Sequence, residues 1–76
     1  MRQGEKEKAI EVFKLNVTLN PESTDVYESL AEGYETAGNK ELAIKNYKRS
    51  LELSPVNKDA QEHLKKLLPS PSIKRI

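Results

Sequence analysis

The sequence predicts an all-α fold, an antiparallel helix-turn-helix repeat with about four helices in a right-handed, solenoid-like stack. The first observation is a repeat: laid on itself at an offset of 34 residues, the chain matches at 11 of the 27 positions from Gly4 to Leu30. Periods of this length are typical of repeat architectures. The second is that apolar residues within each period recur every three or four positions, which is the spacing of an amphipathic helix. The third is that glycine and proline separate these stretches, where helices would end.

The first two helices are expected at residues 5–19 and 24–36. The apolar residues of the first are Ala9, Ile10, Phe13, Val17 and Leu19. In the second, the buried stripe is Tyr27, Leu30, Ala31 and Tyr34. Ser23 directly precedes this helix and is predicted to cap its first turn, because serine side chains accept hydrogen bonds from free amides there.

The third and fourth helices are expected at residues 40–53 and 58–68. Gly38 stands where a left-handed residue ends the second helix, and Asn39 is the predicted cap of the third. Asn57 occupies the matching place before the fourth. Residues 69–76 contain two prolines and two serines, so this tail is expected to be disordered.

Composition excludes several classes of function. A chain of 76 residues is long enough for one domain with a small core. It has no cysteine and one histidine, which argues against a zinc site or thiolate chemistry, and we expect no catalytic residue, metal or cofactor. A net charge of +1 argues against nucleic acid as the partner, and no apolar run is long enough to predict a membrane span.

The repeat carries a recognisable set of residues at fixed positions. They are Tyr27, Leu30, Ala31, Tyr34, Gly38, Ala43, Tyr47 and Pro55. In this set the chain resembles the tetratricopeptide repeat (TPR) family. The resemblance implies one domain over residues 1–68, with the second half of a unit at 4–21, a complete unit at 24–57 and a capping helix at 58–68. It also implies a protein-protein interaction module, whose groove is lined by the first helix of each unit.

An acidic stripe coincides with the positions that the resemblance assigns to the groove. Its members on the second and fourth helices are Asp25, Glu28, Glu32, Glu35, Asp59 and Glu62. The first four are spaced 3, 4 and 3 residues apart, so they share one face of one helix. The hypothesis is that this surface binds a basic peptide or protein segment. The alternative is a solvated face with no ligand.

A second resemblance suggests a structural role. The segments 13–16 and 25–32, joined by Asn20 and Pro21, resemble the short C-terminal TPR extension of some bacterial β-lactamase-like serine hydrolases. If that resemblance holds, the chain is a docking appendage of a larger protein. Its role is then intramolecular packing or dimerisation.

Assembly is the last expectation from the sequence. Apolar residues surround more than half of the first helix, so one neighbouring helix cannot bury them all. We therefore expect an assembly surface that includes Ile10, Phe13 and Val17, closed by a homodimer in isolation or by contact with a preceding domain. The sequence indicates no cellular compartment.

Overall fold

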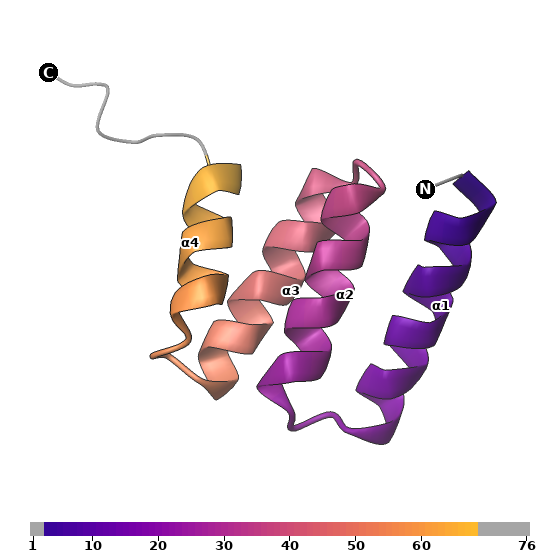
Figure 1. Ribbon diagram of the computed structural model, residues 1–76. Coiled ribbons are helices and arrows are strands. Elements are labelled where there is room, and N and C mark those ends of the chain that lie inside the picture. Colours follow the sequence, from indigo (N-terminus) through magenta and orange to yellow (C-terminus); the bar gives the residue numbers. More distant parts are fainter. Residues whose placement is uncertain (1–2, 69–76) are drawn as a thin grey trace, which may run out of the picture.

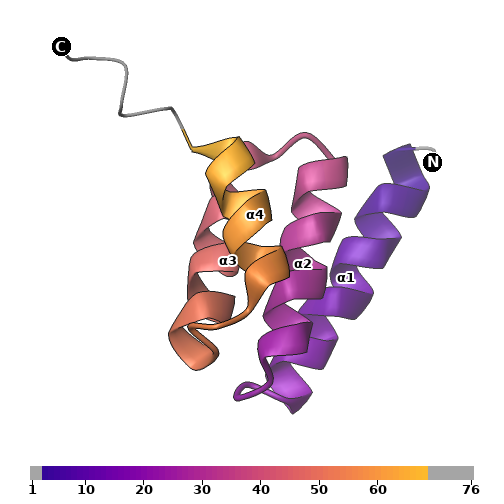
Figure 2. The ribbon, with the colours of Figure 1, turned by 60° about the vertical axis from the view of Figure 1, so that its left-hand side comes forward.

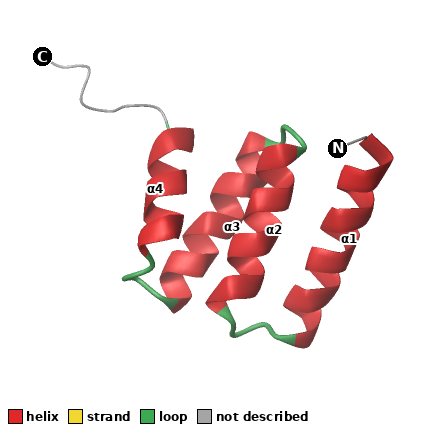
Figure 3. Ribbon diagram, in the orientation of Figure 1, coloured by secondary structure: helices red, strands yellow, loops and turns green. Residues whose placement is uncertain are grey.

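The described part of the chain, residues 3–68, folds into a row of four antiparallel helices. The computed structural model describes residues 3–68. The helices are α1 (Gln3–Leu19), α2 (Thr24–Thr36), α3 (Lys40–Leu53) and α4 (Lys58–Leu67). Each packs against the next along the chain, α2 and α3 most extensively, and the described part contains no strand (Figures 1 and 3). The predicted all-α helical-repeat class is confirmed, and the expected disordered tail lies outside the described residues.

Three turn residues behave as the sequence predicts. Gly38 has a φ of 85°, in the left-handed region that glycine adopts without strain. The side chain of Asn39 accepts a hydrogen bond from the Leu42 amide at 3.2 Å. Asn57 accepts one from the Ala60 amide at the same distance, so α3 and α4 both begin with a satisfied cap.

Other helix ends differ from the expectation. Ser23 precedes α2, but its side chain makes no capping hydrogen bond, and the turn is held instead by its amide, which donates to the Asn20 carbonyl at 3.1 Å. Helix α1 begins two residues earlier than expected. Helix α4 ends one residue earlier, because Leu68 precedes a proline and therefore takes an extended conformation, with φ −80° and ψ 146°.

The core is built from small residues around one tyrosine. Ala31, Ala43, Tyr47 and Ala60 have no exposed surface, and they come from α2, α3 and α4. Alanine on facing helices lets the backbones approach closely, and the ring of Tyr47 fills the space between them. Ala31 and Ala43, both in the repeat's set of fixed positions, thus belong to this core.

One polar residue, Ser50, is fully buried beside this core. Its hydroxyl lies 2.7 Å from that of Thr24, and Thr24 also donates to the Ser50 carbonyl at 2.9 Å. Asn57 donates to the Ser50 hydroxyl at 3.3 Å. Because its polar atoms are paired, Ser50 can occupy a buried small position and tie α2, α3 and the start of α4 together.

Gly33 lies at a close contact between α1 and α2. A Cβ atom at this position would lie 3.0 Å from Phe13 Cδ2 and 3.3 Å from Ile10 Cγ1. Glycine within a helix costs about 1 kcal/mol relative to alanine, so the close approach of the two helices explains its presence.

A double-mutant cycle tests this explanation. In the Phe13→Ala background, Gly33→Ala is expected to raise the free energy of unfolding by about 1 kcal/mol, because helix propensity improves without a clash. In the natural background the gain should be smaller or reversed, since the Phe13 ring must move. Urea denaturation followed by circular dichroism measures both values. Equal effects in the two backgrounds would contradict the proposed contact.

No helix in the described part of the chain has both the length and the apolar character needed to cross a membrane.

Candidate functional site

The six acidic residues named above form what we call the carboxylate face. Asp25, Glu28, Glu32 and Glu35 lie on α2, and Asp59 and Glu62 lie on α4. Asp25, Glu32, Asp59 and Glu62 are exposed, whereas Glu28 and Glu35 are half-buried. The face therefore has two kinds of carboxylate, those exposed to solvent and those partly buried against neighbouring residues.

Glu28 is held by the turn that precedes α4. Asn57 donates to Glu28 Oε1 at 3.0 Å, and the same amide nitrogen also reaches the buried Ser50 hydroxyl. Since Asn57 is also the cap of α4, one side chain positions this carboxylate and begins the next helix.

Glu35 is held by a tyrosine and a histidine. The Tyr47 hydroxyl donates to Glu35 Oε1 at 2.8 Å, and His63 Nδ1 lies 3.2 Å from the same oxygen. The rings of Tyr47 and His63 are stacked, with centroids 5.1 Å apart and planes at 16°. Burial, followed by the hydrogen bond to Glu35, raises the pKa of Tyr47, so its hydroxyl remains a donor.

Glu32 lies at the electrostatic centre of the carboxylate face. Partial burial and then the negative charge of Glu28 raise its pKa above the ordinary value. Glu35 and Asp59 raise it further, and only His63 acts in the opposite direction. The structure therefore brings carboxylates from two helices within electrostatic reach of one another, and a cation here would relieve their repulsion.

The α4 part of the face is less acidic than the sequence stripe implies. Glu62 lines a shallow hollow of about 320 Å³ together with Lys65 and Lys66. A neighbouring hollow is lined by Lys58, Gln61, Glu62 and Lys65. The negative charge is thus concentrated on α2, and Asp59 adds to it from α4 beside Lys58.

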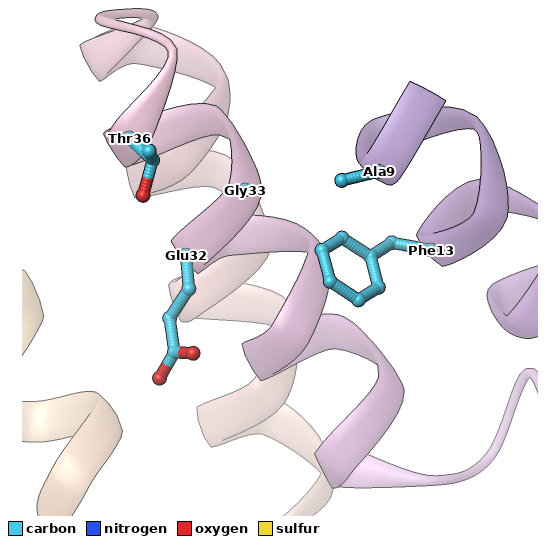
Figure 4. A pocket seen from close by; sticks show the side chains of 5 residues that line it. All are labelled: Ala9, Phe13, Glu32, Gly33 and Thr36. Carbon is cyan, nitrogen blue, oxygen red and sulfur yellow. The ribbon is translucent and has the colours of Figure 1, made fainter. Parts of the chain in front are cut away.

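Two of the three residues predicted to form an assembly surface, Ile10 and Phe13, lie at the α1–α2 contact. Ile10 and Phe13 pack against Gly33, and Ile10, Phe13 and Val17 are all half-buried. Figure 4 shows the Phe13 ring pointing from α1 towards Gly33, at a hollow of about 190 Å³. Its lining residues are Ala9, Phe13, Glu32, Gly33 and Thr36. The Glu32 carboxylate is turned away from the Phe13 ring in this view.

Sequence reasoning missed two residues of the site. His63, the one histidine of the chain, has no role predicted from the sequence, yet it connects α4 to Glu35. Asn57 was recognised as a cap but not as a partner of Glu28. No local sequence pattern predicts either contact, because each joins residues 28 or 29 positions apart and depends on how α4 packs. Within residues 3–68, no group of three or more acidic or histidine side chains is arranged to hold a metal ion.

Comparison with known families identifies the central part of the chain. Residues 24–57 match the tetratricopeptide repeat family, and these are the residues predicted to form the complete unit. Proteins with tetratricopeptide repeats typically mediate protein-protein interactions, and this family is typically non-enzymatic. No curated protein matches the chain. The resemblance to a hydrolase C-terminal extension therefore has no support from the comparisons.

Proposed function

We propose that the chain is a non-enzymatic interaction module whose carboxylate face binds a basic segment of a protein or peptide. The observation that carries this proposal is the charge environment of Glu32, where carboxylates of α2 and α4 converge on an exposed side chain. The match of residues 24–57 to a family of interaction modules supports it.

The geometry favours a cationic ligand for two reasons. Glu28 and Glu35 are already fixed by hydrogen bonds, so less conformational entropy is lost when a ligand binds beside them. Glu32 is exposed and free to turn towards an ammonium or guanidinium group. Lys58, Lys65 and Lys66 of α4 would repel a cation, so we expect the basic part of the ligand to lie over α2.

Peptide titration tests the carboxylate face. A lysine-rich peptide is expected to bind more tightly than a glutamate-rich peptide of equal length, and its affinity should fall as salt is raised. Replacing Glu28 and Glu32 together with glutamine should weaken binding roughly 2- to 30-fold, since two ion pairs at the protein surface are lost. Glutamine retains the oxygen that accepts from Asn57, so the fold should be unaffected.

The matched control is Glu11→Gln with Glu41→Gln, which removes the same charge at exposed positions outside the face. This variant should bind as the natural chain does. Equal affinity for acidic and basic peptides at low ionic strength would show that the face is only solvated.

The second proposed role is structural: docking against a larger protein such as a serine hydrolase domain, or homodimerisation, through α1. One observation favours a contact surface on this helix. Val12, Leu15 and Leu19 are 55%, 56% and 66% exposed, although all three are large apolar residues. Apolar side chains clustered on one helix are typical of a surface that another element covers.

Sedimentation equilibrium from micromolar to several hundred micromolar tests self-association. A homodimer is the expected result for the isolated chain, and Leu15→Glu should dissociate it without lowering the helix content. Phe13→Glu is a less specific variant, because Phe13 also contacts Gly33 within one chain. A monomer over the whole range would contradict the dimer.

A further inference from the structure

The carboxylate face is in contact with a side chain of the protein that can itself carry a positive charge, His63 of α4. His63 Nδ1 lies 3.2 Å from Glu35 Oε1. Figure 2 shows α4 in front of α3, and this contact joins α4 to α2. The imidazole therefore lies at one of the carboxylate oxygens that the cation of a ligand would otherwise approach.

The His63 ring is held in this position by more than its contact with Glu35. It stacks on the ring of Tyr47, with centroids 5.1 Å apart and planes at 16°. Tyr47 has no exposed surface, and its hydroxyl donates to the same oxygen of Glu35 at 2.8 Å. Stacking of the two rings does not require a charge on the imidazole, so His63 stays beside Glu35 in its neutral form as well as in its charged form.

The charge of His63 also acts on Glu32. Burial and the neighbouring carboxylates raise the pKa of this exposed side chain, whereas His63 acts to lower it. A protonated His63 therefore offsets part of the negative potential at Glu32. Histidine side chains change their charge between pH 5 and 8, whereas lysine side chains of a ligand stay charged over this range. The attraction between the face and a basic ligand thus depends on the protonation of His63.

The groups around His63 show which sign the surrounding potential has. From α2 it contacts Glu35, with Glu32 and Glu28 farther along the same face. From α3 it contacts Tyr47, which stays neutral because burial and then the hydrogen bond to Glu35 raise its pKa. The charged residues within one turn on α4 are two acids and two bases, Asp59, Glu62, Lys65 and Lys66. Since the charges on α4 balance, the carboxylates of α2 make the surroundings of His63 negative.

We propose that His63 is an internal cation that competes with the basic ligand and makes binding at the carboxylate face depend on pH. The inference rests on the proposed function of that face. In its protonated form His63 pairs with Glu35 and weakens the attraction for a basic segment. In its neutral form it adds no positive charge, and the carboxylates act on the ligand alone. Affinity therefore rises as pH increases through the range in which histidine loses its proton.

Calorimetric titration of the full chain with a lysine-rich peptide at pH 5.5 and pH 7.5 measures this dependence. The natural chain is expected to bind roughly 2- to 5-fold more tightly at pH 7.5, the effect of one partly exposed charge pair. His63→Asn keeps an amide nitrogen near the position of Nδ1 but takes up no proton. At pH 5.5 it should bind more tightly than the natural chain by the same factor, and at pH 7.5 the two should bind equally.

Two further variants separate the charge of His63 from its packing. His63→Phe keeps a ring that can stack on Tyr47 and should match His63→Asn at both pH values. His63→Lys carries its charge at both and should bind weakly at both. Circular dichroism verifies that each variant keeps its helix content. Comparing variants at one pH removes the contribution of Glu32, whose own protonation would also weaken binding as the pH falls.

NMR of the imidazole provides a second measurement. Because the coupling between proton and ligand is reciprocal, adding the peptide at pH 6.5 should move the His63 resonances towards those of the neutral form. A purely structural histidine would show no such change.

The outcomes distinguish this inference from the proposed function. If the natural chain, His63→Asn and His63→Phe all bound the peptide equally at pH 5.5, the inference would be overturned and the carboxylate face would remain a binding surface. Tighter binding by the natural chain at pH 5.5 than at pH 7.5 would also overturn it. Lack of binding by every variant at pH 7.5 would contradict the proposed function itself, and the inference with it.

Discussion

Replacing Tyr47 with alanine is expected to lower the free energy of unfolding by about 3 to 5 kcal/mol, the range found for truncating a large buried aromatic side chain. Tyr47 has no exposed surface, its ring stacks on His63, and its hydroxyl donates to Glu35. The substitution would open a cavity among α2, α3 and α4. It would also remove the stacking contact between Tyr47 and His63 of α4. Urea denaturation followed by circular dichroism measures the loss, which for a chain of this size could abolish folding at 25 °C.

Tyr47→Phe is the matched control because it keeps the ring and removes the hydroxyl. Tyr47→Phe is expected to lower the free energy of unfolding by about 1 kcal/mol, the net contribution of one hydrogen bond. The loss is larger to the extent that the half-buried Glu35 carboxylate is left without this donor. If the alanine and phenylalanine variants unfolded at the same urea concentration, the hydroxyl and not the packed ring would hold the core together.

Ala43→Leu is expected to destabilise the chain by about 1 to 3 kcal/mol, because a well-packed core does not accept extra methylene groups without strain. Ala43 has no exposed surface and belongs to the same buried cluster as Ala31. The repeat supplies the control: Ala9 is the counterpart of Ala43 on α1, is half-buried, and borders the hollow of about 190 Å³.

Ala9→Leu should therefore change the free energy of unfolding by no more than about 0.5 kcal/mol, as for substitutions away from a packed core. Thermal or urea denaturation of the two variants side by side makes the comparison. Equal destabilisation would mean that Ala9 is packed as closely as Ala43.

The helices could be predicted from the sequence because their determinants are local. Apolar spacing located α2 and α3 at the bounds that the structure has, and Gly38, Asn39 and Asn57 occupy the turn and cap positions predicted for them. Ser23 shows the limit of this reasoning. A residue type that favours a cap does not guarantee a capping bond, because the geometry of the turn decides where its side chain points.

The candidate site could be predicted only in part. The acidic stripe on α2 follows from helical periodicity alone, but the bonds from Asn57 to Glu28 and from His63 to Glu35 depend on how α4 packs. On α1, periodicity indicates that apolar residues surround the helix without indicating which side meets a neighbour. The structure shows which side this is: Ile10 and Phe13 lie against Gly33 of α2, whereas Val12, Leu15 and Leu19 are exposed.

The central proposal is that the carboxylate face binds a basic segment, and residue-resolved NMR titration with a lysine-rich peptide tests it most directly. Chemical-shift changes are expected to concentrate around Glu28, Glu32 and Asp59, on the groove side of α2 and at the start of α4, and to be absent with a glutamate-rich peptide. Changes centred on the exposed side of α3, or the same pattern with both peptides, would contradict it.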